Sequence, residues 1–134
     1  MTRLCLDTSA YSHFMRGHEP AVEAIVRARW VGLPVVVLGE LRAGFSAGRH
    51  RGANESALGA FIANPYVTVL DVDDDAARHY ADIVTELRRA GTPVPSNDIW
   101  IAAVAAREGA RVLTYDGHFE RIKRVGTHLL LVEA

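Results

Sequence analysis

Short apolar segments alternate with longer amphipathic segments along this chain, and the alternation restricts the fold more than any other feature of the sequence. Strands are expected at residues 4–6, up to about 33, 66–70, 112–114 and 129–132, and the segments between them show the spacing of helices. Strands that alternate with helices form a parallel sheet with helices on both faces. We therefore expect an α/β protein with three layers, in which two layers of helices enclose a mainly parallel central sheet.

The stretch 35–37 is ambiguous, because three successive valines favour a strand. Pro34, however, suits the first position of a helix, and apolar residues recur at helical spacing from Leu38 to Phe45. We expect a short strand up to about residue 33, followed by a helix that carries Glu40.

Capping residues and prolines mark other helix starts. Asp7 is a good N-cap for a helix through about residue 15, and Ser96 or Asn97 is expected to cap a helix that runs to about residue 107. Pro20 opens another helix, whose apolar stripe is expected to include Trp30.

Length and composition indicate one domain over residues 1–134. A chain of 134 residues with 49% hydrophobic residues can bury one sizeable core. Cys5 is the only cysteine, which excludes an internal disulfide and a multi-cysteine zinc site. No apolar run reaches the ~18–20 residues of a membrane span, and only residues 4–6 separate Arg3 from Asp7, too few for a signal peptide. We expect a cytoplasmic protein with no membrane partner.

Three acidic residues lie where parallel sheets bind ligands, just beyond the carboxyl ends of strands. Asp7 directly follows the first expected strand, Asp116 follows the strand at 112–114 after one residue, and Asp98 lies in the first turn of a helix. A fourth acid, Glu40, interrupts an apolar stretch. An isolated carboxylate buried there would cost several kcal/mol or become protonated.

Each acid also has a purely structural explanation. Asp7 could act only as a helix cap, Asp98 could only complement a helix dipole, and Asp116 followed by glycine is a common turn. Glu40 could face solvent. Carboxylates that converge, by contrast, repel one another unless a cation neutralises them, and Mg²⁺ or Mn²⁺ takes oxygen ligands. One or two such ions support hydrolysis of a phosphodiester.

Four segments that contain these acids resemble PIN-domain nucleases, especially the VapC toxins. The segments are residues 6–9 (LDTS), 37–44 (VLGELRAG), 97–103 (NDIWIAA) and 113–119 (LTYDGHF). Each segment is weak evidence alone, but their order and spacing over nearly the whole chain are together fairly specific.

The resemblance implies a PIN-like α/β/α sandwich and an endoribonuclease that cleaves RNA with Mg²⁺ or Mn²⁺. It assigns catalysis and metal binding to four acids: Asp7, Glu40, Asp98 and Asp116. Ser9 and Thr114 match hydroxyl positions that support such a site. Asn97, next to Asp98, could also support the site, although a helix cap is the favoured role.

The resemblance also implies partners. An RNA substrate, a VapB-type antitoxin and a second copy of the chain are expected, which would make this chain the toxin of a type II toxin–antitoxin pair. DNA would be bound only through the antitoxin complex. The basic residues that could grip RNA phosphates, or could instead be solvated surface charges, are Arg42, Arg49, Arg51, Arg121, Lys123 and Arg124. His50 and His118 have no partner at a metal-ligand spacing, so surface or packing roles are expected for both.

Other functions are weighed against this one. A PIN-like RNA-binding or scaffold module without catalysis is the main alternative. A haloacid-type phosphatase also begins with a strand ending in Asp, but it needs a second acid two residues later, where this chain has Ser9. A receiver domain needs an acidic neighbour for Asp7 and a lysine after a late strand, and Lys123, the only lysine, does not follow one.

Overall fold

One parallel sheet organises the part of the chain that the computed structural model describes, residues 2–132. In chain order the elements are β1 (Arg3–Leu6), α1 (Thr8–Met15), α2 (Glu19–Arg27), β2 (Trp30–Pro34), α3 (Val35–Ala47), α4 (Arg51–Ile62), β3 (Val67–Leu70), α5 (Asp74–Ala90), α6 (Ser96–Glu108), β4 (Arg111–Thr114), the 3₁₀ helix η1 (Gly117–Arg121) and β5 (Thr127–Leu129). The strand order is β3-β2-β1-β4-β5, and every neighbouring pair is parallel.

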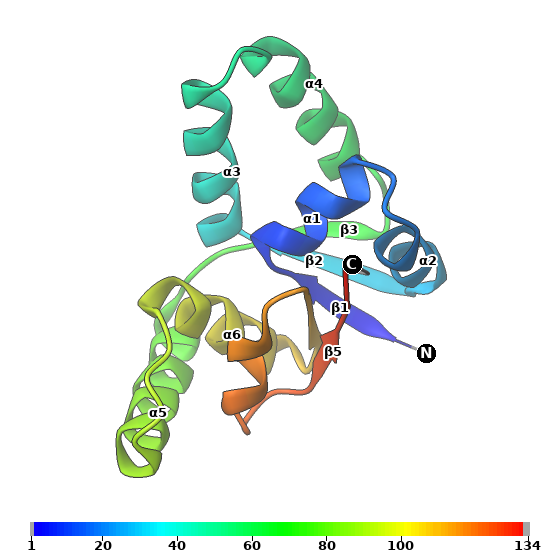
Figure 1. The fold of residues 1–134 in the computed structure, drawn as a ribbon. Helices are drawn as coiled ribbons and strands as arrows, with labels where there is room; N and C mark the ends of the chain where they lie inside the picture. The colour runs from blue at the N-terminus through cyan, green and yellow to red at the C-terminus, as the bar shows by residue number, and fades with distance from the viewer. Residues whose placement is uncertain (1, 133–134) are drawn as a thin grey trace.

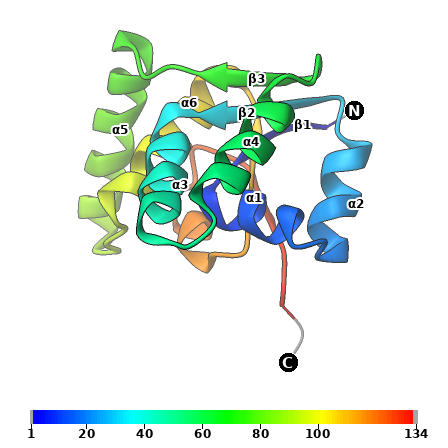
Figure 2. The ribbon, with the colours of Figure 1, turned by 90° about the horizontal axis from the view of Figure 1, so that it is seen from above.

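Helices cover both faces of this sheet. Helices α1 to α4 lie on one side of it, and α5 and α6 lie on the other (Figure 1). Helix α1 packs on β1 and β4, while α6 packs on β1 and β2 from the opposite face. Seen from above, α5 and α2 lie at opposite ends of the molecule (Figure 2). This arrangement confirms the three-layer α/β/α fold expected from the sequence.

The central strand β1 is buried on both faces, as the continuous apolar run before Asp7 requires. Leu4, Cys5 and Leu6 are each no more than 1% exposed, and Leu6 is paired in register with Leu113 of β4. Burial raises the pKa of the Cys5 thiol, so this cysteine remains a protonated core residue.

The ambiguous stretch 35–37 is helical. Strand β2 ends at Pro34, and α3 begins at the next residue with Pro34 as its N-cap. Because proline has no N–H to donate to a neighbouring strand, Pro34 is a suitable residue at which β2 ends. Val37 is fully buried on the core face of the helix that follows. Packing of the helix on the core therefore overrides the strand preference of valine, as expected.

Some predicted boundaries are wrong. Helix α2 ends at Arg27, and Trp30 begins β2 instead, where its indole N–H donates to the Thr68 hydroxyl at 3.0 Å. The Arg3 guanidinium lies over the same ring, 4.1 Å from its centre. The Trp30 side chain therefore contacts residues of the two strands that flank β2, Arg3 of β1 and Thr68 of β3.

The start of α6 and the last strand also differ from the prediction. The N-cap of α6 is Pro95, so Ser96 and Asn97 lie inside the helix and neither caps it. Strand β5 covers Thr127–Leu129 and not residues 129–132. Its hydrogen bonding is set by β4, which ends at Thr114 in register with Leu129.

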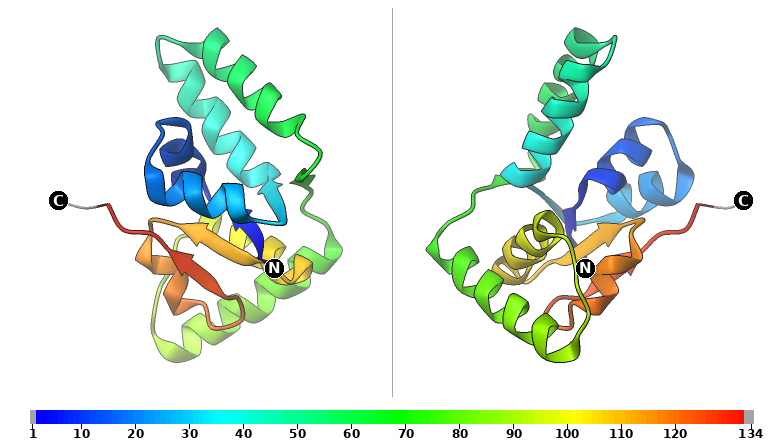
Figure 3. Two further views of the ribbon diagram at one scale, coloured as in Figure 1. Left: turned by 90° about the vertical axis from the view of Figure 1, so that its right-hand side faces the viewer. Right: turned by 60° about the vertical axis from the view of Figure 1, so that its left-hand side comes forward.

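The helical hairpin α3–α4 projects away from the sheet (Figures 1 and 3). The carboxyl ends of β1 and β4 lie side by side, and the first turns of α1 and α3 continue directly from β1 and β2. This edge of the sheet brings several distant acids together. Within residues 2–132, no helix combines the length and apolar character needed to cross a membrane.

Candidate functional site

Asp7, at the carboxyl end of β1, accepts more hydrogen bonds within residues 2–132 than any other acid of the set. It is 5% exposed, and as N-cap of α1 its Oδ1 accepts a hydrogen bond from the Ala10 N–H at 2.9 Å. The Ser9 hydroxyl donates to the same oxygen at 2.8 Å, and the Thr114 hydroxyl donates to Oδ2. Burial raises the pKa of this carboxyl, while the three donated hydrogen bonds act in the opposite direction.

The end of β4 is joined to this carboxylate through hydroxyl groups. Thr114 is fully buried, and its oxygen also accepts the Asp116 backbone N–H at 2.8 Å. The Tyr115 N–H donates to the Ser9 hydroxyl at 3.1 Å. Ser9 and Thr114, which the sequence predicts to support the site, therefore link Asp7 to the turn that carries Asp116.

Glu40 reaches the same edge from the second turn of α3. The Thr8 hydroxyl donates to its Oε1 at 2.9 Å, and the Asn97 amide lies 3.4 Å from its Oε2. The side chain is half-buried and does not simply face solvent. The Asn97 amide contacts the site instead of capping α6, so the favoured cap role is wrong and the alternative, a supporting role, is the one observed. The contact from Thr8 is not expected from the sequence.

Asp98, in the first turn of α6, completes the set. Burial, followed by the charges of Asp116 and Asp7, raises its pKa to about 6. All four acids line one pocket of about 310 Å³, together with Thr8, Ser9 and Ile101. Among residues 2–132, four carboxylates line this pocket and no lysine or arginine does.

This donor set fits a hard divalent cation. Carboxylate oxygens are the preferred ligands of Mg²⁺ and Mn²⁺. The negative charges of Asp116 and Asp7, which together with burial raise the pKa of Asp98, are the charges that such an ion would neutralise. Hydrogen bonds from the hydroxyls of Thr8, Ser9 and Thr114 hold the carboxylates of Asp7 and Glu40 in place without neutralising their charge.

His118, for which the sequence predicts only a surface or packing role, lies beside two of the acids. Its Nδ1 lies 3.1 Å from Asp116 Oδ1 and 3.6 Å from Asp98 Oδ2. Its spacing from Asp98 in the chain follows no metal-ligand pattern. Only the packing of η1 against α6 brings the two residues together, so the sequence carries no signal for this contact.

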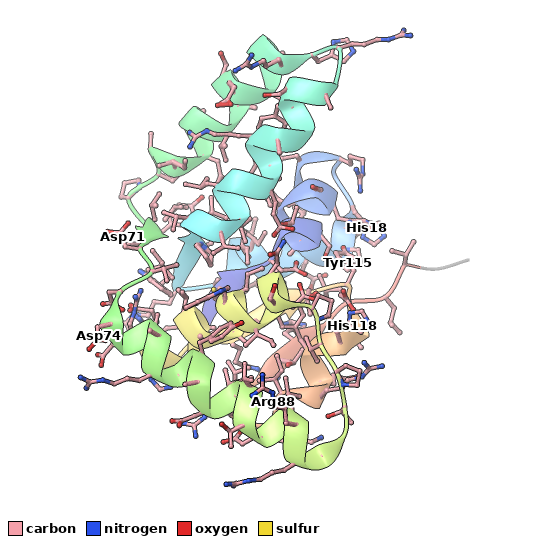
Figure 4. The ribbon with its side chains drawn as sticks, turned by 90° about the vertical axis from the view of Figure 1, so that its left-hand side faces the viewer. His18, Asp71, Asp74, Arg88, Tyr115 and His118 are labelled. Carbon is pink, nitrogen blue, oxygen red and sulfur yellow. The ribbon has the colours of Figure 1, made fainter. Side chains whose placement is uncertain are left out.

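A stack of rings borders the same turn. The Tyr115 ring stacks on His13 with 4.0 Å between centres, and the Tyr115 hydroxyl is within 2.5 Å of His18 Nδ1 (Figure 4). His13 in turn contacts the Ser9 carbonyl oxygen at 2.9 Å. These contacts brace the backbone beside Asp116 and Asp7.

The six basic candidates are spread over three places. Arg42 on α3 pairs with Glu55 at 3.1 Å. The basic residues at the end of η1 and just after it make other contacts: Arg121 donates to the Pro93 carbonyl, Arg124 pairs with Asp82 and Glu86, and Lys123 donates to the Glu120 carbonyl.

Arg49 and Arg51 lie at the exposed turn between α3 and α4. Within residues 2–132 no ion pair or side-chain hydrogen bond involves either of them. Their charges are therefore the ones most available to a phosphate backbone.

Replacing Thr114 with valine tests the link between the two strand ends. Thr114→Val keeps the shape of the side chain but leaves Asp7 Oδ2 and the Asp116 N–H without their buried partner. We expect the free energy of unfolding to fall by about 2 kcal/mol, as for loss of a buried hydrogen bond to a charged group. Urea denaturation of the two proteins in EDTA measures the difference.

Thr85→Val is the matched control, because the Thr85 hydroxyl is exposed on α5 and bonds only to the Ala81 carbonyl in its own helix. Its effect should stay within about 0.5 kcal/mol. Equal stabilities of Thr114→Val and the unsubstituted protein would show that the hydroxyl bridge does not hold the site.

Comparison with known proteins places this geometry in a family. The PIN domain model matches residues 4–125. Ribonuclease VapC5 of Mycobacterium tuberculosis is 38% identical over 114 residues, which cover 85% of this chain and 83% of that protein. Among solved structures, DNA-bound VapBC from Salmonella typhimurium superposes with a TM-score of 0.82 at 30% identity, covering 96% of this chain and 98% of that one.

A second solved structure is the VapBC-5 member of the toxin–antitoxin family from Mycobacterium tuberculosis, with a TM-score of 0.74 and 32% identity over 98% of this chain and 100% of that one. The matches extend over nearly the whole fold and include the segments that carry the four acids. This chain belongs to the PIN domain family, among the VapC ribonucleases.

Proposed function

We propose that this chain is a Mg²⁺- or Mn²⁺-dependent endoribonuclease that hydrolyses RNA phosphodiester bonds. The observation that carries the proposal is the convergence of four carboxylates on one pocket that no basic side chain of residues 2–132 lines. The family supports the ribonuclease activity, since ribonuclease VapC5 is among the relatives of the chain. We propose that residues 1–134 act as one catalytic domain.

In this proposal Asp7, Glu40, Asp98 and Asp116 hold the ion. When bound, the cation supplies neutralising charge to the scissile phosphate and acidifies the attacking water. The protein keeps the acids in place: three donors orient the Asp7 carboxylate, and Thr8 orients Glu40. Ser9 and Thr114 support the site through these bonds.

Arg49 and Arg51 are proposed to bind the RNA backbone away from the reacting phosphate. Both lie at the tip of the hairpin α3–α4, whose first helix carries Glu40. A strand of RNA that enters the acidic pocket would meet positive charge there, which offsets the repulsion between phosphate and the acids. Arg42, Arg121, Lys123 and Arg124 would need to exchange their present partners to do the same.

The alternative of an RNA-binding or scaffold module is tested by incubating labelled RNA with the purified chain and Mn²⁺. Shortened products that increase with time support the nuclease. RNA that is retained by the protein but stays intact would favour the non-catalytic module. The Asp7→Asn variant, in which an amide of nearly the same shape replaces the central acid, identifies a contaminating nuclease if it cleaves at an equal rate.

We further propose that the chain is the toxin of a type II pair and acts with a VapB-type antitoxin. The VapBC-5 structure is described as a member of a toxin–antitoxin family, and the Salmonella typhimurium complex is bound to DNA. DNA would be bound here only through such an antitoxin complex. A homodimer, which sedimentation at micromolar concentration would detect, is part of the same proposal.

Expression in a bacterial host tests the toxin proposal. Induction of the chain alone should reduce growth by cleaving host RNA, and co-expression of the antitoxin encoded beside it should restore growth. Induced Asp98→Asn protein, at equal soluble amounts, is the control and should be harmless. Normal growth with abundant active ribonuclease would contradict the toxin proposal and leave the nuclease intact.

A further inference from the structure

We propose that His118 is a nitrogen ligand for a divalent transition-metal ion, at a subsite formed with Asp98 and Asp116. The inference rests on the proposed metal-dependent function and adds to it a preference among metals: Mn²⁺ should bind more tightly than Mg²⁺ because of this histidine. The four acids alone would present only oxygen ligands.

The three side chains have the separations that a shared ion requires. One ligand atom from each of Asp98, Asp116 and His118 lies within 4.8 Å of the other two. His118 Nδ1 is 3.1 Å from Asp116 Oδ1 and 3.6 Å from Asp98 Oδ2. Neighbouring ligands on an octahedral ion with bonds of about 2.1–2.2 Å are about 3 Å apart, so these gaps need only small adjustments.

The imidazole is oriented toward the acids and not toward solvent. Its Nδ1 has almost no accessible surface and makes no geometrically acceptable hydrogen bond within the described residues, although the side chain as a whole is 40% exposed. The exposed edge therefore carries Nε2, which can keep its proton and bond to water while Nδ1 is free to coordinate.

The backbone holds this orientation. The His118 N–H donates to Asp116 Oδ1 at 2.8 Å, at the start of η1. The next residue, Phe119, is fully buried and anchors the short helix in the core. His118 and Asp116 are thus fixed in one turn, and α6 supplies Asp98 from the other side.

An imidazole ligand changes which ion the site prefers. Mg²⁺ favours oxygen ligands and dehydrates reluctantly, whereas Mn²⁺ and later transition metals accept imidazole nitrogen more readily. A purely electrostatic role would be different: a protonated imidazole paired with the two acids would be displaced when any divalent ion binds. The two roles differ in whether nitrogen touches the bound ion.

The test uses the full chain, freed of metal with EDTA and dialysed. Calorimetric titration with Mn²⁺ and with Mg²⁺ compares unsubstituted protein, His118→Ala and the control His50→Ala, whose histidine lies at the exposed α3–α4 turn. We expect His118→Ala to weaken Mn²⁺ binding about tenfold and to change Mg²⁺ binding less than about twofold. Pulsed electron paramagnetic resonance of bound Mn²⁺ should detect nitrogen coupling that His118→Ala removes and His50→Ala retains.

Absence of nitrogen coupling in the unsubstituted protein, with Mn²⁺ bound and its affinity unchanged by His118→Ala, would overturn the inference and leave the four-acid site standing. Failure of the unsubstituted protein to bind either ion would overturn both the inference and the metal-dependent function. Equal weakening of Mg²⁺ and Mn²⁺ would also overturn the inference, because it indicates a general disturbance of the acids.

Discussion

Removal of divalent cations is expected to abolish RNA cleavage by this chain, and addition of Mg²⁺ or Mn²⁺ is expected to restore it. The pocket and the phosphodiester are both anionic, and in the described part of the chain no lysine or arginine lines the pocket to offset the repulsion. Without a cation the substrate is repelled and nothing stabilises the charge that develops on the phosphate. We expect the initial rate on labelled RNA to fall by at least about 100-fold in excess EDTA.

Two controls separate metal removal from other effects of the chelator. EDTA saturated beforehand with Mg²⁺ should leave the rate unchanged. A thermal melt should show that the protein remains folded in free EDTA, because the hydrogen bonds of the sheet and the burial of its core do not involve the ion. Cleavage that continues at its full rate in excess EDTA would mean that the four acids act without a metal, and the proposed mechanism would be wrong.

Much of the fold follows from local sequence patterns. The apolar run before Asp7 is long enough for one buried strand and too short for a helix, so β1 is predicted within a residue. The N-cap of α6 is not predicted correctly, because Ser96 and Asn97 both favour the cap position while the chain uses Pro95. The Asn97 amide then faces Glu40, a contact made by the packing of α3 on α6, which no local pattern records.

The site is predictable to the extent that its residues end strands. Asp7 and Asp116 follow β1 and β4, which are neighbours in the sheet, so their proximity follows from parallel topology. Glu40 could be predicted as a member of the site because a carboxylate within an apolar stretch is costly to bury without a polar or charged partner. His118 could not be predicted in the same way, because its contact with Asp98 depends on how η1 is placed against α6.

The sequence identifies the basic residues but does not show which of them are free to bind RNA. The charge of an arginine can be read from the sequence, but its ion pairs cannot. In the structure, Arg42 and Arg124 are already paired with acids. Arg49 and Arg51 make no such pair within residues 2–132 and lie at a helical turn that projects from the body (Figure 3). Exposure of that turn comes from the length of α3 and α4, and the sequence suggests the turn without showing how far it extends.

Asp98 gives the pocket a pH dependence whose sign can be worked out. Its pKa in the folded protein is raised to about 6, first by burial and then by Asp116 and Asp7. In the unfolded chain the value is near 4. The folded state therefore binds a proton more tightly, which stabilises it fully below about pH 4, and this contribution is lost as the pH rises through about 6. At neutral pH the metal-free protein carries the cost of four crowded charges.

Asp98→Asn should remove that cost and the activity together. An amide has nearly the same shape but does not ionise, so metal-free protein should gain about 1 kcal/mol at pH 7. The pKa difference is worth up to about 3 kcal/mol, which part exposure and the lost interaction with the helix dipole reduce. Cleavage should fall at least about 100-fold, and most of the rise in melting temperature with Mn²⁺ should disappear, because that rise measures binding to the folded state.

Asp75→Asn is the matched control for this substitution. Asp75 also lies in the first turn of a helix, α5, but it is exposed and lines no part of the acidic pocket. Its replacement should lower stability slightly by loss of the dipole interaction and should leave cleavage and the Mn²⁺ response intact. Thermal melts at pH 4.5 and pH 7, with and without Mn²⁺, distinguish the two variants. If Asp98→Asn behaves like Asp75→Asn, Asp98 only complements the helix dipole, and the ion must be held without it.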